Sequence, residues 1–345
     1  IDPDKYNNFD GVDKVIGNTE KLQLQTWRDL NKLKKINVGN ILEENTTVPS
    51  SIEKFEGKSR AYIEIQQGCD HRCTFCIIPY GRGNNRSVPA GEIITKIKNF
   101  VNNGYNEVVL TGVDITDYGK DLPAKPTFSN LIGRILKLVP ELKQLRLSSI
   151  DCAEIDIDFW DVLKDKRLMP HFHISLQAGN NMILKRMKRR HSREMAIEFC
   201  KKVLSIREDA TFGADIIAGF PTETEEMFLD SIRLVDECQL THLHVFPYSP
   251  RDKTPASRMP QLDKNTIKER AKRLRKKGFE KLEENLKNKI GKKELILIEN
   301  NKDNISLGKD QNFIKVKIGE QIKEGKIISC IYTGIEGDTL LAKIA

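Results

Sequence analysis

The sequence lacks the features that would assign it to a membrane or secreted class. None of its apolar runs approaches the roughly 18 residues of a membrane-spanning helix, and its start lacks the charged and apolar regions of a signal peptide. Its seven cysteines are an odd number, and four of them are scattered: Cys152, Cys200, Cys238 and Cys330. Such spacing does not suit a secreted disulfide framework. We therefore expect a cytoplasmic protein with no membrane partner.

Positive charge is in modest excess over the 345 residues of the chain. Lys and Arg number 57 against 49 Asp and Glu, which gives a formal net charge of +8. Much of the excess lies in residues 262–293, which hold thirteen Lys or Arg against four Glu. This pattern favours a polyanionic partner such as nucleic acid, although charge alone does not identify one.

Strand and helix patterns alternate from about residue 60 onward. Short apolar or β-branched runs are followed by amphipathic segments such as residues 90–104 and 192–208. Strands that alternate with helices form parallel sheets with right-handed crossovers, so six such units predict an α/β fold with a partial (β/α)6 barrel of the TIM type. Barrels of this kind carry their chemistry at the carboxyl ends of the strands. The predicted strands are residues 61–66, 107–112, 144–150, 171–177, 211–220 and 242–248.

Composition and periodicity divide the chain into four expected parts. Residues 1–55 are polar and resemble the end of another domain followed by a linker. Residues 56–260 hold the predicted barrel, and residues 261–289 form a basic connecting helix. Residues 290–345 alternate with period two between turn residues, which predicts a small all-β domain.

Three cysteines lie within eight residues of the segment QQGCDHRCTFCIIPYGRG, which follows the first predicted strand: Cys69, Cys73 and Cys76. A structural zinc ion is one interpretation, but zinc normally takes four ligands, and His71 is too close to its neighbours to complete the same tetrahedron. A disulfide with a spare thiol is a second interpretation, which a reducing compartment disfavours. A four-iron cluster on three thiolates is the third, and it leaves one iron open for a small chelating ligand.

The spacing C-x3-C-x2-C, with Phe75 directly before the last cysteine, resembles the signature of the radical S-adenosylmethionine enzymes. This resemblance implies a [4Fe-4S] cluster on Cys69, Cys73 and Cys76, with S-adenosylmethionine bound at the open iron. One electron from the cluster would cleave the sulfonium bond and give a 5′-deoxyadenosyl radical. The barrel would supply orientation and exclude water.

Further segments resemble the methylthiotransferase branch of that superfamily, among them EVVLTGVDITDYG, HISLQAGNNMILKRMKRRH, DIIAGFPTETEEMF and HVFPYSPRDKTPA. They are most similar to the enzymes that methylthiolate C2 of N6-threonylcarbamoyladenosine 37 in tRNA. Residues 11–21 match the end of that family's N-terminal domain, most of which would be absent, and residues 290–345 resemble its RNA-binding TRAM domain. Branches that act on isopentenyladenosine 37 or on a ribosomal-protein aspartate share the chemistry and remain alternatives.

The resemblance also implies that strand ends line the cofactor and substrate pocket. GFPTET has a simple local interpretation as well, since Thr222 or Thr224 would cap a helix. The residues expected to line the pocket are Phe75, Thr111, Gly112, Ser148, Gln177, Asp215, Gly219, Val245 and Phe246.

The family pattern is incomplete in one respect. The family carries a second cluster on three widely spaced cysteines of its N-terminal domain, and none of the other four cysteines has that placement. We expect those four to be packed thiols and the second set of ligands to lie upstream of Ile1. The chain alone is then expected to cleave S-adenosylmethionine but not to transfer sulfur.

The remaining candidate site residues are histidines and basic residues near the predicted strand ends. His171 with His173, and His242 with His244, each share one strand face; packed or hydrogen-bonded histidines are favoured over metal ligands, because no carboxylates accompany them. A basic run after residue 184 is favoured for phosphate contact over a solvated helix face. The run comprises Lys185, Arg186, Lys188, Arg189 and Arg190.

The expected partners follow from this interpretation. They are tRNA, an electron donor and an unidentified sulfur source, and the protein is expected to be a monomer. A non-catalytic RNA-binding protein with a structural metal loop is the alternative from a different functional class.

Overall fold

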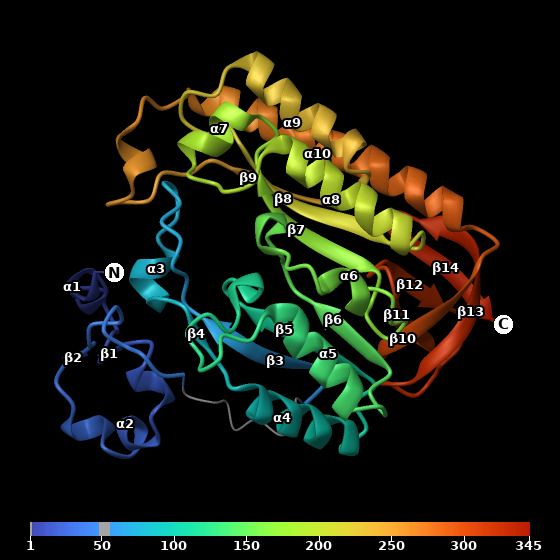
Figure 1. Ribbon diagram of the computed structural model, residues 1–345, viewed down its shortest axis with the longest axis horizontal. Helices are drawn as coiled ribbons and strands as arrows, with labels where there is room; N and C mark the ends of the chain where they lie inside the picture. The colour runs from blue at the N-terminus through green and yellow to red at the C-terminus, as the bar shows by residue number, and fades with distance from the viewer. Residues whose placement is uncertain (1, 48–55) are drawn as a thin grey trace.

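A partial barrel of six parallel strands forms the centre of the computed structural model, which describes residues 2–47 and 56–345 (Figure 1). Two hydrogen-bonded sheets, β3-β5-β6 and β7-β8-β9, are joined between β6 and β7 by two isolated bridges. The predicted partial barrel is therefore confirmed. Its strands are β3 (Arg60–Gln67), β5 (Glu107–Gly112), β6 (Gln144–Leu147), β7 (His171–Gln177), β8 (Thr211–Ala218) and β9 (Leu240–Pro247), with β4 (Arg86–Ser87) antiparallel to β3.

Helices cover the outer face of the barrel, because every second residue of each strand is apolar and points towards them. On β7, Phe172, Ile174 and Leu176 join the main core, which leaves the alternate residues of that strand to face the interior. The helices that contribute to this core are α4 (Ala90–Asn102), α5 (Phe128–Leu138), α6 (Phe159–Val162), α8 (Arg193–Ile206) and α9 (Glu225–Glu237). Two shorter helices, α3 (Ile78–Arg82) and α7 (Asn181–Arg186), lie outside it.

Side-chain caps fix the starts of several helices. The hydroxyl groups of Thr127, Ser192 and Thr224 each accept a hydrogen bond from a backbone N–H of the first turn. Thr224 is therefore the cap in the GFPTET segment, and Thr222 instead adopts a positive φ of 68°. Short 3-10 turns lie at Glu20–Leu22, Leu30–Lys32, Ile115–Asp117, Cys152–Glu154 and Pro255–Arg258.

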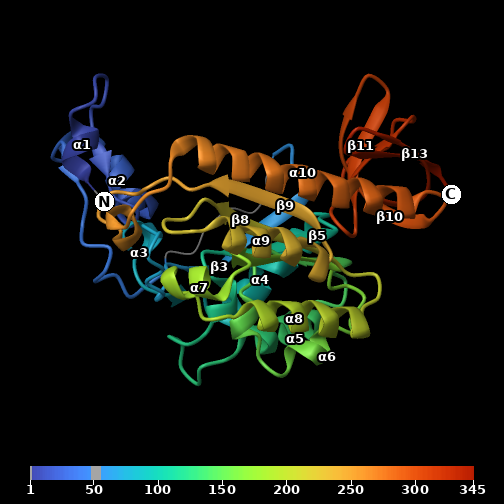
Figure 2. The ribbon, with the colours of Figure 1, turned by 90° about the horizontal axis from the view of Figure 1, so that it is seen from above.

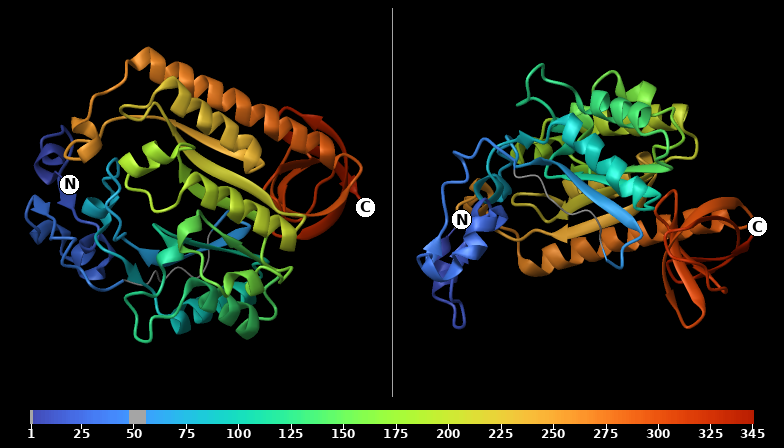
Figure 3. Two further views of the ribbon diagram at one scale, coloured as in Figure 1. Left: turned by 45° about the horizontal axis from the view of Figure 1, so that its top comes forward. Right: turned by 90° about the horizontal axis from the view of Figure 1, so that it is seen from below.

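The long helix α10 (Lys264–Lys289) runs along β9 and connects the barrel to the C-terminal domain (Figure 3). Ile267, Ala271 and Leu274 form its buried side, and most of its charged residues face outward. Among the described residues, no helix combines the length and apolar composition needed to cross a bilayer.

The C-terminal residues form a small closed barrel with its own apolar core. Its strands are β10 (Lys293–Lys302), β11 (Ile305–Asp310), β12 (Lys315–Ile318), β13 (Ile327–Glu336) and β14 (Thr339–Ile344), in the order β10-β11-β12-β14-β13. Phe313 stacks on His171, at the start of β7, with ring centroids 6.0 Å apart. The small barrel thus docks on the amino ends of the core strands.

The N-terminal segment lies at the opposite end of the molecule from this small barrel (Figures 1 and 2). It contains α1 (Pro3–Asn7), β1 (Val15–Ile16), α2 (Leu24–Arg28) and β2 (Ile36–Asn37), and its two short strands pair in parallel. Part of the predicted linker, residues 48–55, lies outside the described residues.

Candidate functional site

The three clustered cysteines lie at the carboxyl ends of the barrel strands, where the loop after β3 brings them to one cavity. Cys69, Cys73 and Cys76 line an empty volume of about 650 Å³. Loops after β5 and β6, the end of β7 and one arginine supply most of the remaining wall. Its other residues are His71, Phe75, Ile78, Val113, Asp114, Ser149, Asp151, Ser175, Gln177 and Arg189.

Gly68 sets the path of the cysteine loop at the end of β3. Its φ is +70°, and a Cβ at this position would lie 1.8 Å from the backbone oxygen of Asn84, so only glycine fits the turn. Backbone hydrogen bonds then fasten the loop on two sides. The Cys69 N–H donates to the Gly83 carbonyl (3.1 Å), and the Thr74 N–H donates to the Met187 carbonyl (3.0 Å).

Gln66 links the cysteine loop to the neighbouring strand and was missed by the sequence analysis. Its fully buried side chain accepts hydrogen bonds from the backbone N–H groups of Val113 (3.0 Å) and Asp114 (2.8 Å). Its amide donates to the Gly68 carbonyl (2.8 Å) and to Asn85 Oδ1 (2.6 Å). The sequence feature that could have identified Gln66 is an amide side chain next to the last residue of the strand that leads into the cysteine loop.

As free thiols, Cys69 and Cys76 resist ionisation. Burial, followed by the Asp114 charge, raises the pKa of Cys69 to about 12, and burial also raises the pKa of Cys76. The Arg189 Nη1 atom lies 3.8 Å from Cys73 Sγ. Metal-bound cysteines are thiolates, and a cationic metal centre supplies the positive charge that several buried thiolates require. The donor set therefore fits an iron–sulfur cluster on three cysteines.

His71 lies inside the cysteine loop but is held by carboxylates. Its Nε2 is 3.0 Å from Asp114 Oδ2 and 3.4 Å from Glu154 Oε1. Although ligand atoms of Cys69, His71 and Asp114 lie within 4.8 Å of one another, Asp114 and then Glu154 raise the pKa of His71 to about 9. The ring is therefore placed to pair with these two carboxylates.

The residues expected to contact cofactor or substrate divide into two groups. Phe75 and Gln177 line the cysteine cavity. The other seven do not belong to its wall. Thr111 and Gly112 end β5, the hydroxyl oxygen of Ser148 is buried, and Asp215 contacts two histidines. The Gly219 N–H donates to Glu223, Val245 packs against the main core and Phe246 is half exposed. Contact between these seven and the cofactor stays a prediction.

Three of the five basic residues after position 184 use their side chains within the protein. Arg186 donates to Thr222 (2.9 Å to Oγ1), Arg189 to Asp151 (2.9 Å) and Arg190 to Glu154 (2.6 Å). Among the described residues of this run, Lys185 and Lys188 are exposed and form no such hydrogen bond. Arg189 therefore belongs to the cysteine cavity, and the two lysines are the better candidates for RNA contact.

None of the four scattered cysteines belongs to the wall of the cysteine cavity. Cys200 and Cys238 are buried in the main core and Cys330 in the core of the small barrel, whereas Cys152 is partly buried beside the main core.

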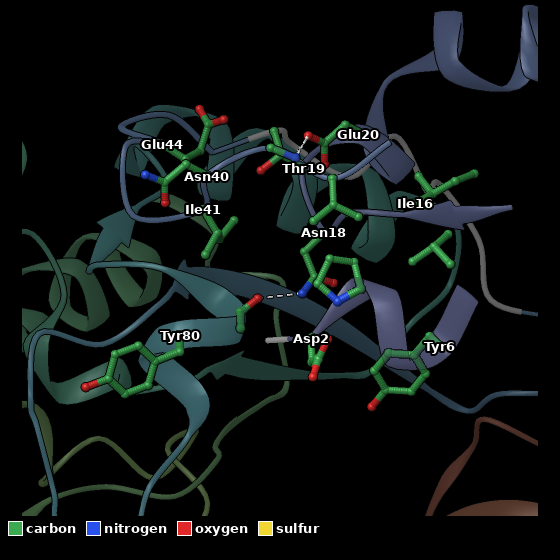
Figure 4. A pocket seen from close by; sticks show the side chains of 16 residues that line it. Asp2, Tyr6, Ile16, Asn18, Thr19, Glu20, Asn40, Ile41, Glu44 and Tyr80 are labelled. Atoms are coloured by element: carbon green, nitrogen blue, oxygen red, sulfur yellow. Dashed lines mark hydrogen bonds between the residues drawn. The ribbon is translucent and has the colours of Figure 1, made fainter. Parts of the chain in front are cut away.

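A second, larger cavity of about 840 Å³ lies between the N-terminal segment and α3 (Figure 4). Asn18 donates from Nδ2 to the Gly81 carbonyl (2.5 Å), which ties the two walls together. Glu20 accepts from the Gly39 N–H (2.6 Å) on the same side. The described wall carries no cysteine or histidine, so we assign the chemistry to the smaller cavity.

Comparisons with known proteins agree with this geometry. Residues 63–235 match the family model of the radical SAM superfamily. The chain is 53% identical over 335 residues to a threonylcarbamoyladenosine tRNA methylthiotransferase MtaB of Rickettsia prowazekii (strain Madrid E), covering 97% of this chain and 78% of that protein. It is 36% identical over 234 residues to a tRNA-2-methylthio-N(6)-dimethylallyladenosine synthase of Shouchella clausii (strain KSM-K16), covering 67% of this chain and 45% of that protein.

A solved structure shares the fold. The cobalamin-dependent S-adenosylmethionine radical enzyme OxsB superposes with a TM-score of 0.51 at 16% identity, covering 82% of this chain and 42% of that one. At this identity the likeness concerns the fold alone.

Proposed function

Because the chain belongs to the radical SAM superfamily and, within it, to the threonylcarbamoyladenosine tRNA methylthiotransferases, we propose that it methylthiolates C2 of N6-threonylcarbamoyladenosine 37 in tRNA. The observation that carries the proposal is the meeting of three thiols on one open cavity at the carboxyl ends of the barrel strands. Identity of 53% over nearly the whole chain favours this substrate over isopentenyladenosine.

Membership of the superfamily implies a [4Fe-4S] cluster and S-adenosylmethionine as cofactors. Cys69, Cys73 and Cys76 would hold the cluster, and we assign one cluster to these residues. When bound, the cluster would supply the electron for reductive cleavage of S-adenosylmethionine, which would provide the radical chemistry needed at the adenine C–H bond. Sulfur and a methyl group from a second S-adenosylmethionine would follow.

The residues of the chain orient and shield this chemistry. The guanidinium of Arg189 donates to Asp151 (2.9 Å) and to the Ser175 carbonyl (2.7 Å), and these bonds hold it beside Cys73. A fixed positive charge at this place stabilises negative charge on the thiolate. Gln66 fixes the loops on either side of the cavity, so the cysteines are held before any ligand binds.

tRNA contact is proposed for two regions. Lys185 and Lys188 are exposed near the mouth of the barrel, and the small C-terminal barrel resembles a TRAM domain. The small barrel lies at the amino ends of the core strands, at least the length of one strand from the cysteines (roughly 25 Å for eight residues). We infer that the bound tRNA extends along the molecule, with one loop base inserted at the mouth.

Replacing Cys73 with alanine tests the proposed chemistry. Anaerobically reconstituted protein is expected to contain about four iron atoms per cluster and to release 5′-deoxyadenosine from S-adenosylmethionine with a reductant. The Cys73→Ala variant is expected to lose most of the iron and at least a hundredfold of the cleavage rate. Cys330→Ala, in the distant small barrel, serves as the matched control and should keep both. Zinc in place of iron in the wild type would reject the proposal.

Nucleoside mass spectrometry tests the substrate. In cells that lack the protein, tRNA is expected to keep threonylcarbamoyladenosine but to lose its methylthio group. Complementation with a gene encoding the whole protein should restore the group, and the same gene with Cys73→Ala should not. Loss of methylthio from isopentenyladenosine instead would move the protein to the neighbouring branch.

A further inference from the structure

Three side chains outside the wall of the cysteine cavity meet inside the barrel: His173 of β7, Asp215 of β8 and His244 of β9. The Nε2 atom of His173 lies 2.9 Å from Asp215 Oδ1, and Nδ1 of His244 lies 3.2 Å from the same oxygen. The three ligand atoms all lie within 4.8 Å of one another. The sequence analysis found no carboxylate beside these histidines, but the neighbouring strand supplies one.

The register of the strands brings the three residues together. Asp215 is the direct partner of His244 across β8 and β9, and His173 pairs with Gly213, two residues before Asp215 on the same face. A Cβ at Gly213 would lie 2.5 Å from Nδ1 of His173. The missing side chain therefore leaves room for the His173 ring to lie over β8 and reach the carboxylate.

This group lies deeper in the barrel than the cysteine cavity. Ser175 and Gln177 line that cavity, and His173 precedes them on the same face of β7. Two residues of a strand span roughly 7 Å, so His173 lies about one layer below Ser175. None of His173, Asp215 and His244 belongs to the wall of the cysteine cavity.

We propose that His173, Asp215 and His244 bind one divalent transition-metal ion of the zinc or ferrous iron class, at a site separate from the three cysteines. Two imidazoles and one carboxylate with further positions open are a recurrent ligand set for such ions. Ligand atoms about 2.1 Å from one ion lie about 3.0–3.4 Å apart at octahedral or tetrahedral angles. The observed separation of 3.2 Å falls within that range, and that of 2.9 Å is 0.1 Å below it.

The competing arrangement is a triad held by hydrogen bonds alone. In that case both rings would donate a proton to the single oxygen Oδ1 of Asp215, with ring centroids only 4.6 Å apart. One metal ion would instead accept a lone pair from each of the three groups. The side chain of His244 is 63% exposed, against 13% for His173 and 22% for Asp215, so an ion can enter from the His244 side.

Cobalt binding tests the proposal without involving the reaction. The full chain is prepared without a purification tag and with Cys69, Cys73 and Cys76 all replaced by alanine, and is then titrated with Co²⁺. We expect one equivalent to bind with visible absorption bands, and Zn²⁺ to displace it. His244→Ala and His173→Ala in the same background are expected to weaken Co²⁺ binding at least tenfold. Because this protein cannot form the proposed cluster, the result is independent of the proposed function.

His71→Ala is the matched control, because it removes the other group of histidine and carboxylates, formed with Asp117 and Glu154. Its Co²⁺ affinity is expected to stay within twofold of the background protein. His244→Gln provides a second variant of an exposed residue, and circular dichroism checks that each variant is folded. Binding of less than 0.2 equivalents, or binding that His244→Ala and His244→Gln leave unchanged, would overturn the proposal.

Discussion

Glu107 is a single carboxylate that holds two arginines at the base of the core barrel. Its Oε1 accepts hydrogen bonds from Arg60 Nε (2.5 Å) and Arg146 Nε (2.8 Å), and its side chain is fully buried. Burial disfavours the ionised form, but the charges of Arg146 and then Arg60 outweigh it and lower the pKa of Glu107 below the ordinary 4.5. Arg60 and Glu107 are the first residues of β3 and β5, and Arg146 lies within β6, so these ion pairs join the three strands.

Replacing Glu107 with glutamine is expected to lower the free energy of unfolding at pH 7 by about 3–5 kcal/mol, because the buried guanidinium of Arg146 loses its counter-charge and that of Arg60 keeps only Glu299. The folded-state pKa lies below the unfolded value, so the carboxylate stabilises the fold above about pH 4.5, and this contribution is lost as the pH falls through the folded-state pKa. Urea unfolding between pH 3 and 7 should show the difference between wild type and variant narrowing as the pH falls.

The control for this prediction is Glu208→Gln, which changes an exposed carboxylate on the surface. Its effect is expected to stay within about 0.5 kcal/mol at every pH. An equally small effect for Glu107→Gln would show that Glu107 does not anchor the strands.

Among the elements, helix α10 packs closely against β9. The helix begins after Asp263, whose carboxylate accepts a hydrogen bond from Thr266 N–H (2.9 Å). Further along, a Cβ at Gly278 would lie 2.8 Å from Cβ of Leu243 on β9. The glycine thus lets the helix approach the strand, against the helix propensity that alanine would give.

We expect Gly278→Ala to destabilise the protein by about 1–3 kcal/mol, because overpacking at the contact exceeds the gain in helix propensity. The matched variant is Gly133→Ala in α5, where a Cβ would meet only Val162 at an ordinary 3.5 Å. Gly133→Ala should be neutral or stabilise by up to about 1 kcal/mol. Thermal and urea unfolding of the two variants measure the difference, and stabilisation by both would contradict the packing argument.

At the scale of the whole molecule, the contact between the core barrel and the small C-terminal barrel decides whether the two domains unfold together. Phe313 adopts a positive φ of 67° and stacks on His171, while the Arg146 guanidinium lies 4.9 Å from its ring centroid. Asn312 donates to the Asp209 carbonyl (2.8 Å) beside it. Because these contacts span the domain boundary, the small barrel and the core are expected to unfold together.

Phe313→Ala is expected to lower stability by about 2–4 kcal/mol through lost ring contacts. Calorimetry of the variant should show two separate transitions where the wild type shows one. Phe279→Ala, on the exposed side of α10 (54% exposed), removes the same side chain from outside the interface and should change stability by less than about 0.5 kcal/mol. A single unshifted transition for Phe313→Ala would show that the ring does not couple the domains.

The local sequence pattern was sufficient to predict the strands of the two barrels and the loop that carries the three clustered cysteines. Strand and helix periodicity predicted the six-stranded partial barrel and the small β domain, because each element buries one face and its sequence records that face. The three cysteines could be recognised because their ligand spacing lies within one loop. The strand predicted at residues 144–150 was longer than the observed β6 (Gln144–Leu147). The ladder with β5 ends at Leu147, and beyond two serines Ile150 forms only an isolated bridge to Ile174.

The contacts between residues that are distant in the chain were decided only by the tertiary structure. The sequence placed Arg189 and Arg190 in a basic run, but folding brings them to Asp151 and Glu154. It placed His173 and His244 on separate strands, but the barrel sets both beside Asp215. Local periodicity determines which face of an element is buried, whereas the partner of a polar side chain depends on strand register and closure, which long-range packing sets.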